Sequence, residues 1–195
     1  MKFIGFYDYT VILTYMSLVS AVYGTTLASR GRFTAAVLCL FFCGFCDAFD
    51  GTVARSKKNR TDDEKAFGIQ IDSLCDCVSF GVFPAMLCYF MGVDGLLGTV
   101  IIAAFSLCAV IRLGFFNVME AKRQQTEDGG NKIYRGLPVT SIAALLPFTY
   151  LFHNVIPEGI FVIILHALLA LVAFLFIFDF TVKKPDIAKI LTKAK

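Results

Sequence analysis

Residues Tyr9–Ser29 read YTVILTYMSLVSAVYGTTLAS, which is 21 consecutive positions without Asp, Glu, Lys or Arg. A helix of about 20 residues is long enough to cross the ~30 Å hydrocarbon core of a bilayer. Two later stretches are as long and as free of charge, Gly136–Pro157 with 22 residues and Gly159–Phe178 with 20. These three stretches predict membrane-spanning helices, and they decide the class of fold.

Further apolar stretches, each bordered or interrupted by charged residues, complete the pattern. Hydrophobic residues make up 57% of the 195 positions and charged residues 17%, whereas about a quarter of a soluble domain is charged. We therefore predict an all-α polytopic membrane protein with six transmembrane helices, formed by one domain over residues 1–195. The spans are expected at about 9–29, 33–54, 69–92, 95–119, 136–154 and 159–181. Because Met1–Asp8 is too short for a cleavable signal sequence, the first helix is expected to remain in the mature protein.

The positions of Lys and Arg predict the orientation in the membrane. With six spans, both termini and the second and fourth loops share one side, which carries 15 of these residues, while the other side carries Arg30 and Arg32. Basic residues in short loops favour the cytoplasmic face. Both termini are therefore expected in the cytoplasm, with the protein integral to the cell membrane. The net charge of +3 follows from this bias and gives no indication of a nucleic-acid partner.

Four aspartates interrupt the second and third predicted helices. Asp47 and Asp50 are three residues apart and Asp72 and Asp76 four apart, so each pair lies on one helical face. A short loop makes the two helices antiparallel neighbours, and all four carboxylates can converge near the cytoplasmic surface. A hard divalent cation bound by oxygen ligands removes the repulsion between them, and four carboxylates suffice for two ions at a phosphoryl group. We predict a site for Mg²⁺ or Mn²⁺, with two ions expected.

Small and basic residues accompany the aspartates. Gly51, Ala54 and Gly68 lie on the same helical faces and leave room for a bulky ligand against the backbone. Arg55 ends the second predicted helix, where its guanidinium group can bind a phosphate through two hydrogen bonds. The cluster is therefore suited to a ligand that contains phosphate.

The four aspartates are also compatible with two roles outside catalysis. They could pair with Arg55 and Arg112 as buried contacts between helices, although four acids and two bases leave two acids unpaired. They could instead belong to a membrane cation transporter, because acids within a membrane often mark ion routes. No acid lies in the outer half of either helix, so an enzyme site is the preferred hypothesis.

Written out, the pattern is Asp47-x2-Asp50-Gly51-x2-Ala54-Arg55-x12-Gly68-x3-Asp72-x3-Asp76. It resembles the signature of the CDP-alcohol phosphotransferase family at eight specified positions, and the likeness extends over almost the whole chain. The family implies six helices, a homodimer among membrane lipids and a two-metal site in a cytoplasm-facing cavity. The resemblance also implies roles for individual residues. The implied metal ligands are Asp47, Asp50, Asp72 and Asp76. Asp76 would also be the base that deprotonates the acceptor. The implied CDP-lipid contacts are Gly51, Ala54, Arg55, Gly68 and Thr61.

The interval between Arg55 and Gly68 is longer than the usual family pattern, and the extra residues within Ser56–Phe67 are expected to form a polar loop. Outside the signature, the chain resembles the integral-membrane phosphatidylserine synthases of bacteria and archaea. The residues that carry this likeness are Phe67–Ala85, Arg112-Leu113-x2-Phe116-Asn117 and Arg135-Gly136-Leu137-Pro138.

This second resemblance implies transfer of a phosphatidyl group from CDP-diacylglycerol to L-serine, which gives phosphatidylserine and CMP. Arg112 and Asn117 would then contact the acceptor or a lipid phosphate, and Phe115 stands where the group commonly has a second arginine. Glycerol 3-phosphate or inositol phosphate as acceptor, or an ether lipid of archaeal type, remain alternatives. By position alone, Arg112 is an uncompensated cation within its helix, and Asp179 is expected to be an interfacial charge.

Overall fold

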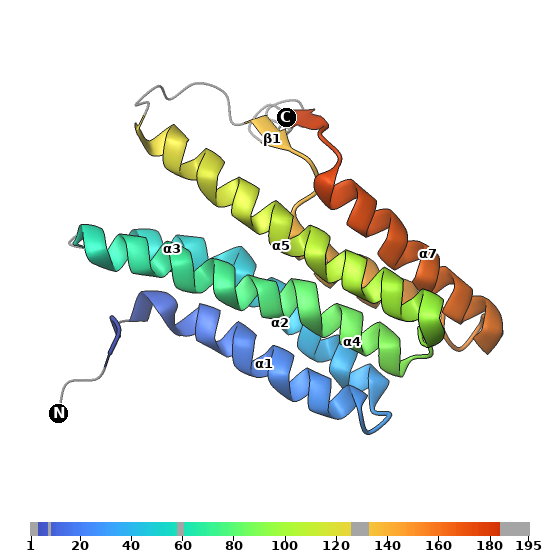
Figure 1. Cartoon of the computed structure of the whole chain (residues 1–195). Helices are drawn as coiled ribbons and strands as arrows, with labels where there is room; N and C mark the ends of the chain where they lie inside the picture. The colour runs from blue at the N-terminus through green and yellow to red at the C-terminus, as the bar shows by residue number, and fades with distance from the viewer. Residues whose placement is uncertain (1–3, 8, 58–60, 126–132, 184–195) are drawn as a thin grey trace, which may run out of the picture.

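The computed structural model is a bundle of long helices that run roughly side by side (Figure 1). It describes residues 4–7, 9–57, 61–125 and 133–183. The elements, in chain order, are η1 (Tyr9–Val11), α1 (Ile12–Ala28), α2 (Phe33–Ser56), α3 (Asp62–Asp76), η2 (Cys77–Val82), α4 (Phe83–Phe90), α5 (Gly95–Gln125), β1 (Ile133–Arg135), η3 (Val139–Ser141), α6 (Ile142–Tyr150), α7 (Glu158–Ile177) and β2 (Thr181–Lys183).

Within the described residues, five helices are long and apolar enough to cross a membrane. They are Tyr9–Ala28, Phe33–Val53, Asp62–Phe90, Gly95–Lys122 and Glu158–Ile177. The predicted all-α polytopic class is therefore confirmed, with the addition of a small ribbon in which β1 and β2 pair antiparallel.

The fifth of the six predicted spans, 136–154, is only partly helical. Its apolar helix covers Val139–Tyr150, which at 1.5 Å per residue is about 18 Å long and shorter than the bilayer core. Pro138 has an extended backbone and directly precedes the helix, a place where the N–H that proline lacks would have no helical partner. The count of six spans is therefore not confirmed.

The distribution of side chains is that of a protein in lipid. Large apolar residues cover the outside, among them Leu96 (85% exposed) and Val19 (67%). The buried polar or charged residues include Ser17, Ser79 and Arg112. A water-soluble protein does not expose apolar surface on this scale, so the chain is an integral membrane protein.

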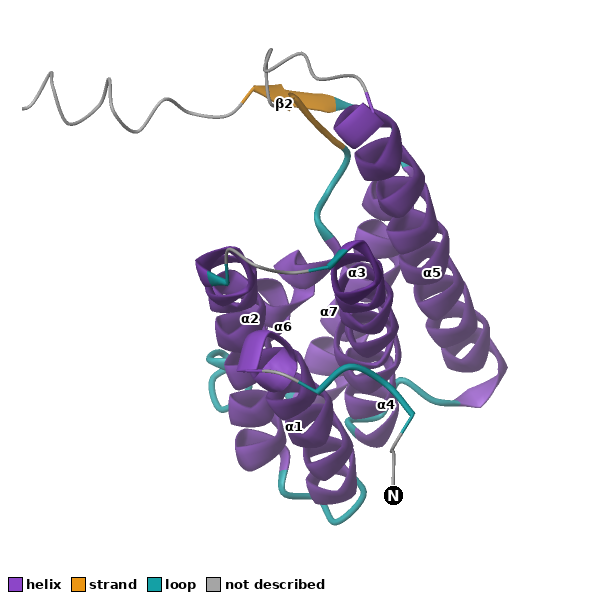
Figure 2. Cartoon of the chain, turned by 90° about the vertical axis from the view of Figure 1, so that its left-hand side faces the viewer, coloured by secondary structure: helices purple, strands orange, loops and turns teal. Residues whose placement is uncertain are grey.

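Helix α1 turns back on α2 through a short connection that contains Gly31, whose φ of +72° lies in the left-handed region open to glycine. The Arg32 N–H donates to the Leu27 carbonyl across this turn. Viewed from one end, the rod formed by α3, η2 and α4 stands between α1 and α5, with α2 and α6 to one side (Figure 2). Helix α7 packs along α5. The rod that carries two of the four aspartates is therefore central.

Small residues allow the helices to approach closely, as is common in membrane bundles. A Cβ atom placed on Gly24 of α1 would overlap the ring of Phe83, which is 1% exposed. Gly44 of α2 faces Ala143 of α6 in the same way, with a Cβ-to-Cβ distance of 2.7 Å. Glycine is therefore required for packing at both crossings.

We expect Gly24→Ala to destabilise the protein by about 1–3 kcal/mol, the usual cost of overpacking a closed core. The Phe83 ring cannot move aside, because it is enclosed between helices. The measurement is the midpoint of thermal unfolding in detergent. The matched control is Gly114→Ala, since a Cβ atom there meets nothing within 4 Å. Equal midpoints for the two variants would show that the crossing at Gly24 is not tight.

Candidate active site

The four aspartates face one another across the bundle. Asp47 and Asp50 come from α2, and Asp72 and Asp76 from the last turns of α3, and all four are partly buried. The carboxyl groups of Asp50 and Asp72 are hydrogen-bonded to each other. Asp76 is close enough to the other three to interact with each electrostatically. The predicted convergence of the four carboxyl groups is therefore present.

The chemistry of this donor set fits a hard divalent cation, because every donor is a carboxyl oxygen. In the described part of the chain, no group of three or more His, Cys, Asp or Glu side chains has the arrangement of a metal site as it stands. Asp50 and Asp72 are hydrogen-bonded to each other, and a hydrogen bond between two carboxyl groups requires a proton on one of them. A cation bound between them would take the place of that proton.

The predicted CDP-lipid contacts lie on the same two helices. Gly51 follows Asp50 in α2, and Gly68 lies one turn before Asp72 in α3. Ala54 and Arg55 belong to the last turn of α2, and their side chains lie outside the described part of the structure. Their predicted contact with a phosphate is therefore untested.

Thr61 has a structural role at the start of α3. Its Oγ1 accepts a hydrogen bond from the Glu64 N–H (3.2 Å), and its own N–H donates to Glu64 Oε2 (2.9 Å), which is a capping box. Glu64 also pairs with Lys57 at 3.2 Å. Helix α3 therefore begins at Asp62, so the prediction that Ser56–Phe67 forms a loop is wrong for its second half. The Thr-x-x-Glu pattern was the sequence signal for this start.

A π-helical turn, η2, follows Asp76 directly. Pro84 explains it, because proline has no N–H and its ring clashes with the carbonyl four residues earlier, that of Phe80. The helix is wider here than an α-helix, and the Phe83 N–H donates to the Val78 carbonyl five residues earlier. Turns of this kind are frequent at functional sites. The turn sets the direction in which the rod continues below Asp76.

Two hydrogen-bonded contacts join this rod to α5, and both were missed by sequence reasoning. Ser73 Oγ and the Asn117 amide bond each other at 3.0 and 2.8 Å, and Ser106 Oγ donates to the Gly81 carbonyl at 3.0 Å. Arg112 lies between Ser106 and Asn117 on α5, and Asp76 lies between Ser73 and Gly81 on the rod. The two residues are therefore at a similar level along the bundle. Asn117, a predicted acceptor contact, thus positions the helix that bears Asp72.

The chain between β1 and α6 also reaches the depth of the cluster. The Gly136 N–H donates to the Phe180 carbonyl at 2.6 Å, and Gly136 has a φ of +70°. Since Gly44 meets Ala143 and the two helices are antiparallel, η3 lies near the level of Asp47. Irregular backbone at such depth occurs where it is enclosed by protein or lines a polar cavity.

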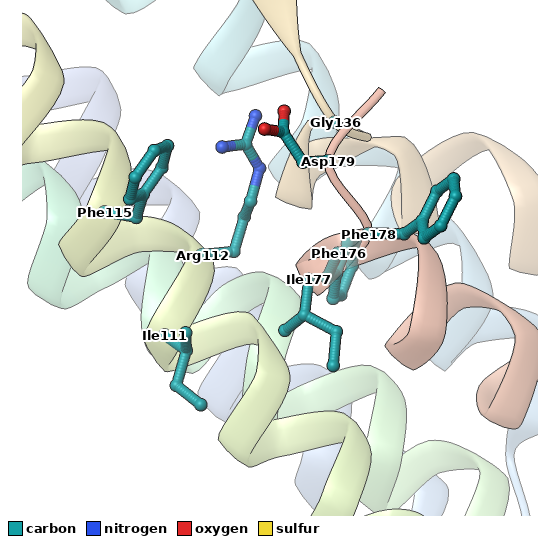
Figure 3. Close-up of a pocket in the computed structure, with 8 residues that line it drawn as sticks. All are labelled: Ile111, Arg112, Phe115, Gly136, Phe176, Ile177, Phe178 and Asp179. Carbon is teal, nitrogen blue, oxygen red and sulfur yellow. The ribbon is translucent and has the colours of Figure 1, made fainter. Parts of the chain in front are cut away.

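Arg112 lies at a pocket of about 200 Å³ between the middle of α5 and the C-terminal end of α7. It is 8% exposed, and its Nε donates to the Leu137 carbonyl at 3.0 Å. Its guanidinium group faces the Asp179 carboxylate (Figure 3). The prediction that Arg112 is uncompensated is therefore wrong, because a residue 67 positions later supplies the opposite charge. Asp179, expected to be an interfacial charge, is exposed just beyond α7 and also faces Arg112.

A model of one protein family matches residues 9–178, and its description is CDP-alcohol phosphatidyltransferase. The chain belongs to the CDP-alcohol phosphatidyltransferase family. Members of this family are in general dependent on a divalent metal. The match extends from η1 to just past the end of α7, so it includes the carboxylate cluster and the lining of the Arg112 pocket except Asp179.

Curated relatives in the CDP-alcohol phosphatidyltransferase family point to a narrower group. The chain is 34% identical over 167 residues to the CDP-diacylglycerol–serine O-phosphatidyltransferase of Saccharomyces cerevisiae, covering 79% of this chain and 58% of the yeast protein. It is 34% identical over 145 residues to the archaetidylserine synthase of Methanothermobacter thermautotrophicus, covering 72% and 56%. A serine O-phosphatidyltransferase of Bacillus subtilis is 39% identical over 90 residues, covering 45% and 49%. The chain thus spans about half the length of these relatives.

Proposed function

We propose that the protein transfers the phosphatidyl group of CDP-diacylglycerol to the hydroxyl group of L-serine, with CMP as the second product. The observation that carries the proposal is the convergence of Asp47, Asp50, Asp72 and Asp76 from two neighbouring helices in a chain of this family. Supporting it, the relatives named above are serine phosphatidyltransferases or an archaetidylserine synthase.

In the proposed reaction, Asp76 accepts the proton of the serine hydroxyl group. The serine oxygen then forms a bond to the lipid-side phosphorus as the bond from that phosphorus to the CMP oxygen breaks. Asp47, Asp50, Asp72 and Asp76 would hold one or two Mg²⁺ or Mn²⁺ ions. When bound, these would neutralise charge on the diphosphate and on the leaving CMP. Positioning and electrostatics carry most of the catalysis in phosphoryl transfer.

The glycines near the cluster suit a nucleotide-bearing lipid. Gly51 and Gly68 lie beside Asp50 and Asp72 on the two facing helices, where the absence of side chains lets a diphosphate approach the backbone. We further propose that Ala54 and Arg55 contact the CDP group. The termini and the site are proposed to face the cytoplasm, and the protein to be a homodimer, whose mass in detergent can be measured by light scattering.

The test is CMP release by the purified protein with CDP-diacylglycerol and Mg²⁺ or Mn²⁺. We expect release with L-serine to exceed release with glycerol 3-phosphate or inositol phosphate by at least about tenfold, because specific polar contacts discriminate strongly between acceptors. In sealed membrane vesicles, serine supplied only to the cytoplasmic face should support the reaction. A preference for glycerol 3-phosphate, or release driven by serine on the outer face, would contradict the proposal.

A further inference from the structure

The pocket at Arg112 contains one cation and one anion. Its charged lining residues are Arg112 and Asp179, and the remainder is aromatic or aliphatic apart from Gly136. Phe115 contributes a ring to this wall rather than a second positive charge (Figure 3). The described lining of the pocket is therefore close to neutral overall, with its two charges adjacent.

The Arg112 guanidinium group is held in place. Its Nε donates to the Leu137 carbonyl, and the side chain is buried between α5, α7 and the segment at Gly136. A guanidinium group fixed in this way presents a planar set of donors suited to a carboxylate or a phosphate. The Asp179 carboxylate lies next to it (Figure 3), and Asp179 is exposed.

The pocket is small. Its volume of about 200 Å³ is below the ~300–1,000 Å³ of sites for drug-sized molecules. A free amino acid is of the right size, and its two charged groups match the two charges of the lining. A lipid headgroup that bears both an ammonium and a carboxylate has the same chemistry.

The pocket is at the right depth for the reaction. The contacts Ser73–Asn117 and Gly81–Ser106 fix the register between the central rod and α5. Arg112 lies between these contacts on α5, as Asp76 does on the rod. The two residues are therefore at a similar level along the bundle, Arg112 on α5 and Asp76 at the end of α3, directly before η2, which packs against α5.

We propose that Arg112 binds the α-carboxylate of the amino-acid acceptor and that Asp179 binds its α-ammonium group, which makes Asp179 the residue that restricts the acceptor to an amino acid. This inference rests on the transferase function proposed above. Asp179 also acts against competing acceptors, because its negative charge repels the phosphate of glycerol 3-phosphate or inositol phosphate.

The first experiment compares Asp179→Asn with the wild-type full-length protein in phosphatidylcholine nanodiscs that contain CDP-diacylglycerol. The loss of a charge-assisted contact should raise KM for L-serine by about tenfold to a hundredfold, with kcat and the KM for CDP-diacylglycerol within about twofold. Asp94→Asn is the matched control, because Asp94 is an exposed carboxylate between α4 and α5, and it should change none of these values. An unchanged KM for serine in Asp179→Asn would overturn the proposal.

The ligand 3-hydroxypropionate, which is serine without its amino group, identifies the group that Asp179 recognises. The wild type should use it at least about tenfold less efficiently than serine, and Asp179→Asn should remove most of that difference. If Asp179 served only to tie α7 to Arg112, the variant would lose thermal stability while this ratio stayed the same, which would refute the proposal. Asp179→Glu keeps the charge, should fold, and should retain the preference for serine.

Equilibrium binding of radiolabelled L-serine to the same nanodisc samples separates the two proposals. Binding that Asp179→Asn weakens at least about tenfold, without any CMP release, would support this site and refute the transferase function. CMP release with binding that does not depend on Asp179 would refute this site alone, and so would the absence of serine binding by the wild type. Binding of labelled phosphatidylserine that depends on Asp179, in a wild type that binds no radiolabelled L-serine, would assign the pocket to a lipid headgroup and overturn the acceptor role.

Discussion

Asp76→Asn is expected to lower kcat for CMP release with serine by about 10²–10⁴-fold, the usual contribution of a general base. The amide keeps an oxygen atom where the carboxylate stood but cannot accept the proton of the serine hydroxyl. Affinity for CDP-diacylglycerol should stay within a few-fold of the wild-type value. Steady-state kinetics in detergent or nanodiscs, together with direct binding of the CDP-lipid, measure the two effects separately.

Comparison with Asp72→Asn distinguishes the loss of a general base from the loss of a metal ligand. Asp72 lies one turn earlier on α3 and is hydrogen-bonded to Asp50, so its loss should weaken metal and CDP-lipid binding together. Asp63→Asn, an exposed carboxylate in the first turn of the same helix, should have no effect. Near-normal turnover of Asp76→Asn, or a loss of lipid binding as severe as in Asp72→Asn, would leave Asp76 as only a further ligand.

Asp47→Ala, Asp50→Ala and Asp72→Ala should each abolish both turnover and its dependence on a divalent metal. Each variant removes a carboxylate from the cluster, and the loss of several kcal/mol of charge stabilisation corresponds to at least about a thousandfold in rate. CMP release as a function of Mg²⁺ and Mn²⁺ concentration is the measurement. Asp94→Asn is again the matched control, because Asp94 follows α4 at the other end of the rod.

The same variants distinguish an enzyme from a transporter. An enzyme should release CMP in liposomes without moving divalent ions across them. Ion flux that requires Asp47 or Asp72, with no CMP release from the wild type, would contradict the transferase proposal. Retention of the folded state in each variant can be verified by its elution as a single species and by its thermal midpoint.

The charged side chains within the membrane helices are accommodated by partners inside the bundle. Charged groups within a membrane are costly unless they face the interior of the bundle or a polar cavity. Asp50 and Asp72 satisfy this condition by bonding each other between two helices. Arg112 does so by bonding the Leu137 carbonyl and facing Asp179. The apolar outer surface of α5 can then face lipid.

The sequence by itself determined the features that depend on residues close together in the chain. Uncharged runs as long as a bilayer is thick predict the membrane helices at Tyr9–Ser29 and Gly159–Phe178, because length and polarity decide insertion. Helical spacing places Asp47 with Asp50, and Asp72 with Asp76, on single faces, and the short connection between their helices predicts that the two pairs meet. The start of α3 at Asp62 carries a sequence signal, the Thr61–Glu64 capping box, but we predicted a loop there from the sequence.

Only the tertiary structure decided the features that join distant parts of the chain. The approach of Asp179 to Arg112 depends on how α7 packs on α5 and on the turn at Gly136, and no local pattern encodes it. The segment Gly136–Ser141 enters the bundle beside α2. Of the predicted span, only Val139–Tyr150 is an apolar helix, and this too depends on contacts that no local pattern encodes. Local periodicity fixes which face a side chain occupies, whereas its partner across the bundle is set by the packing of all the helices together.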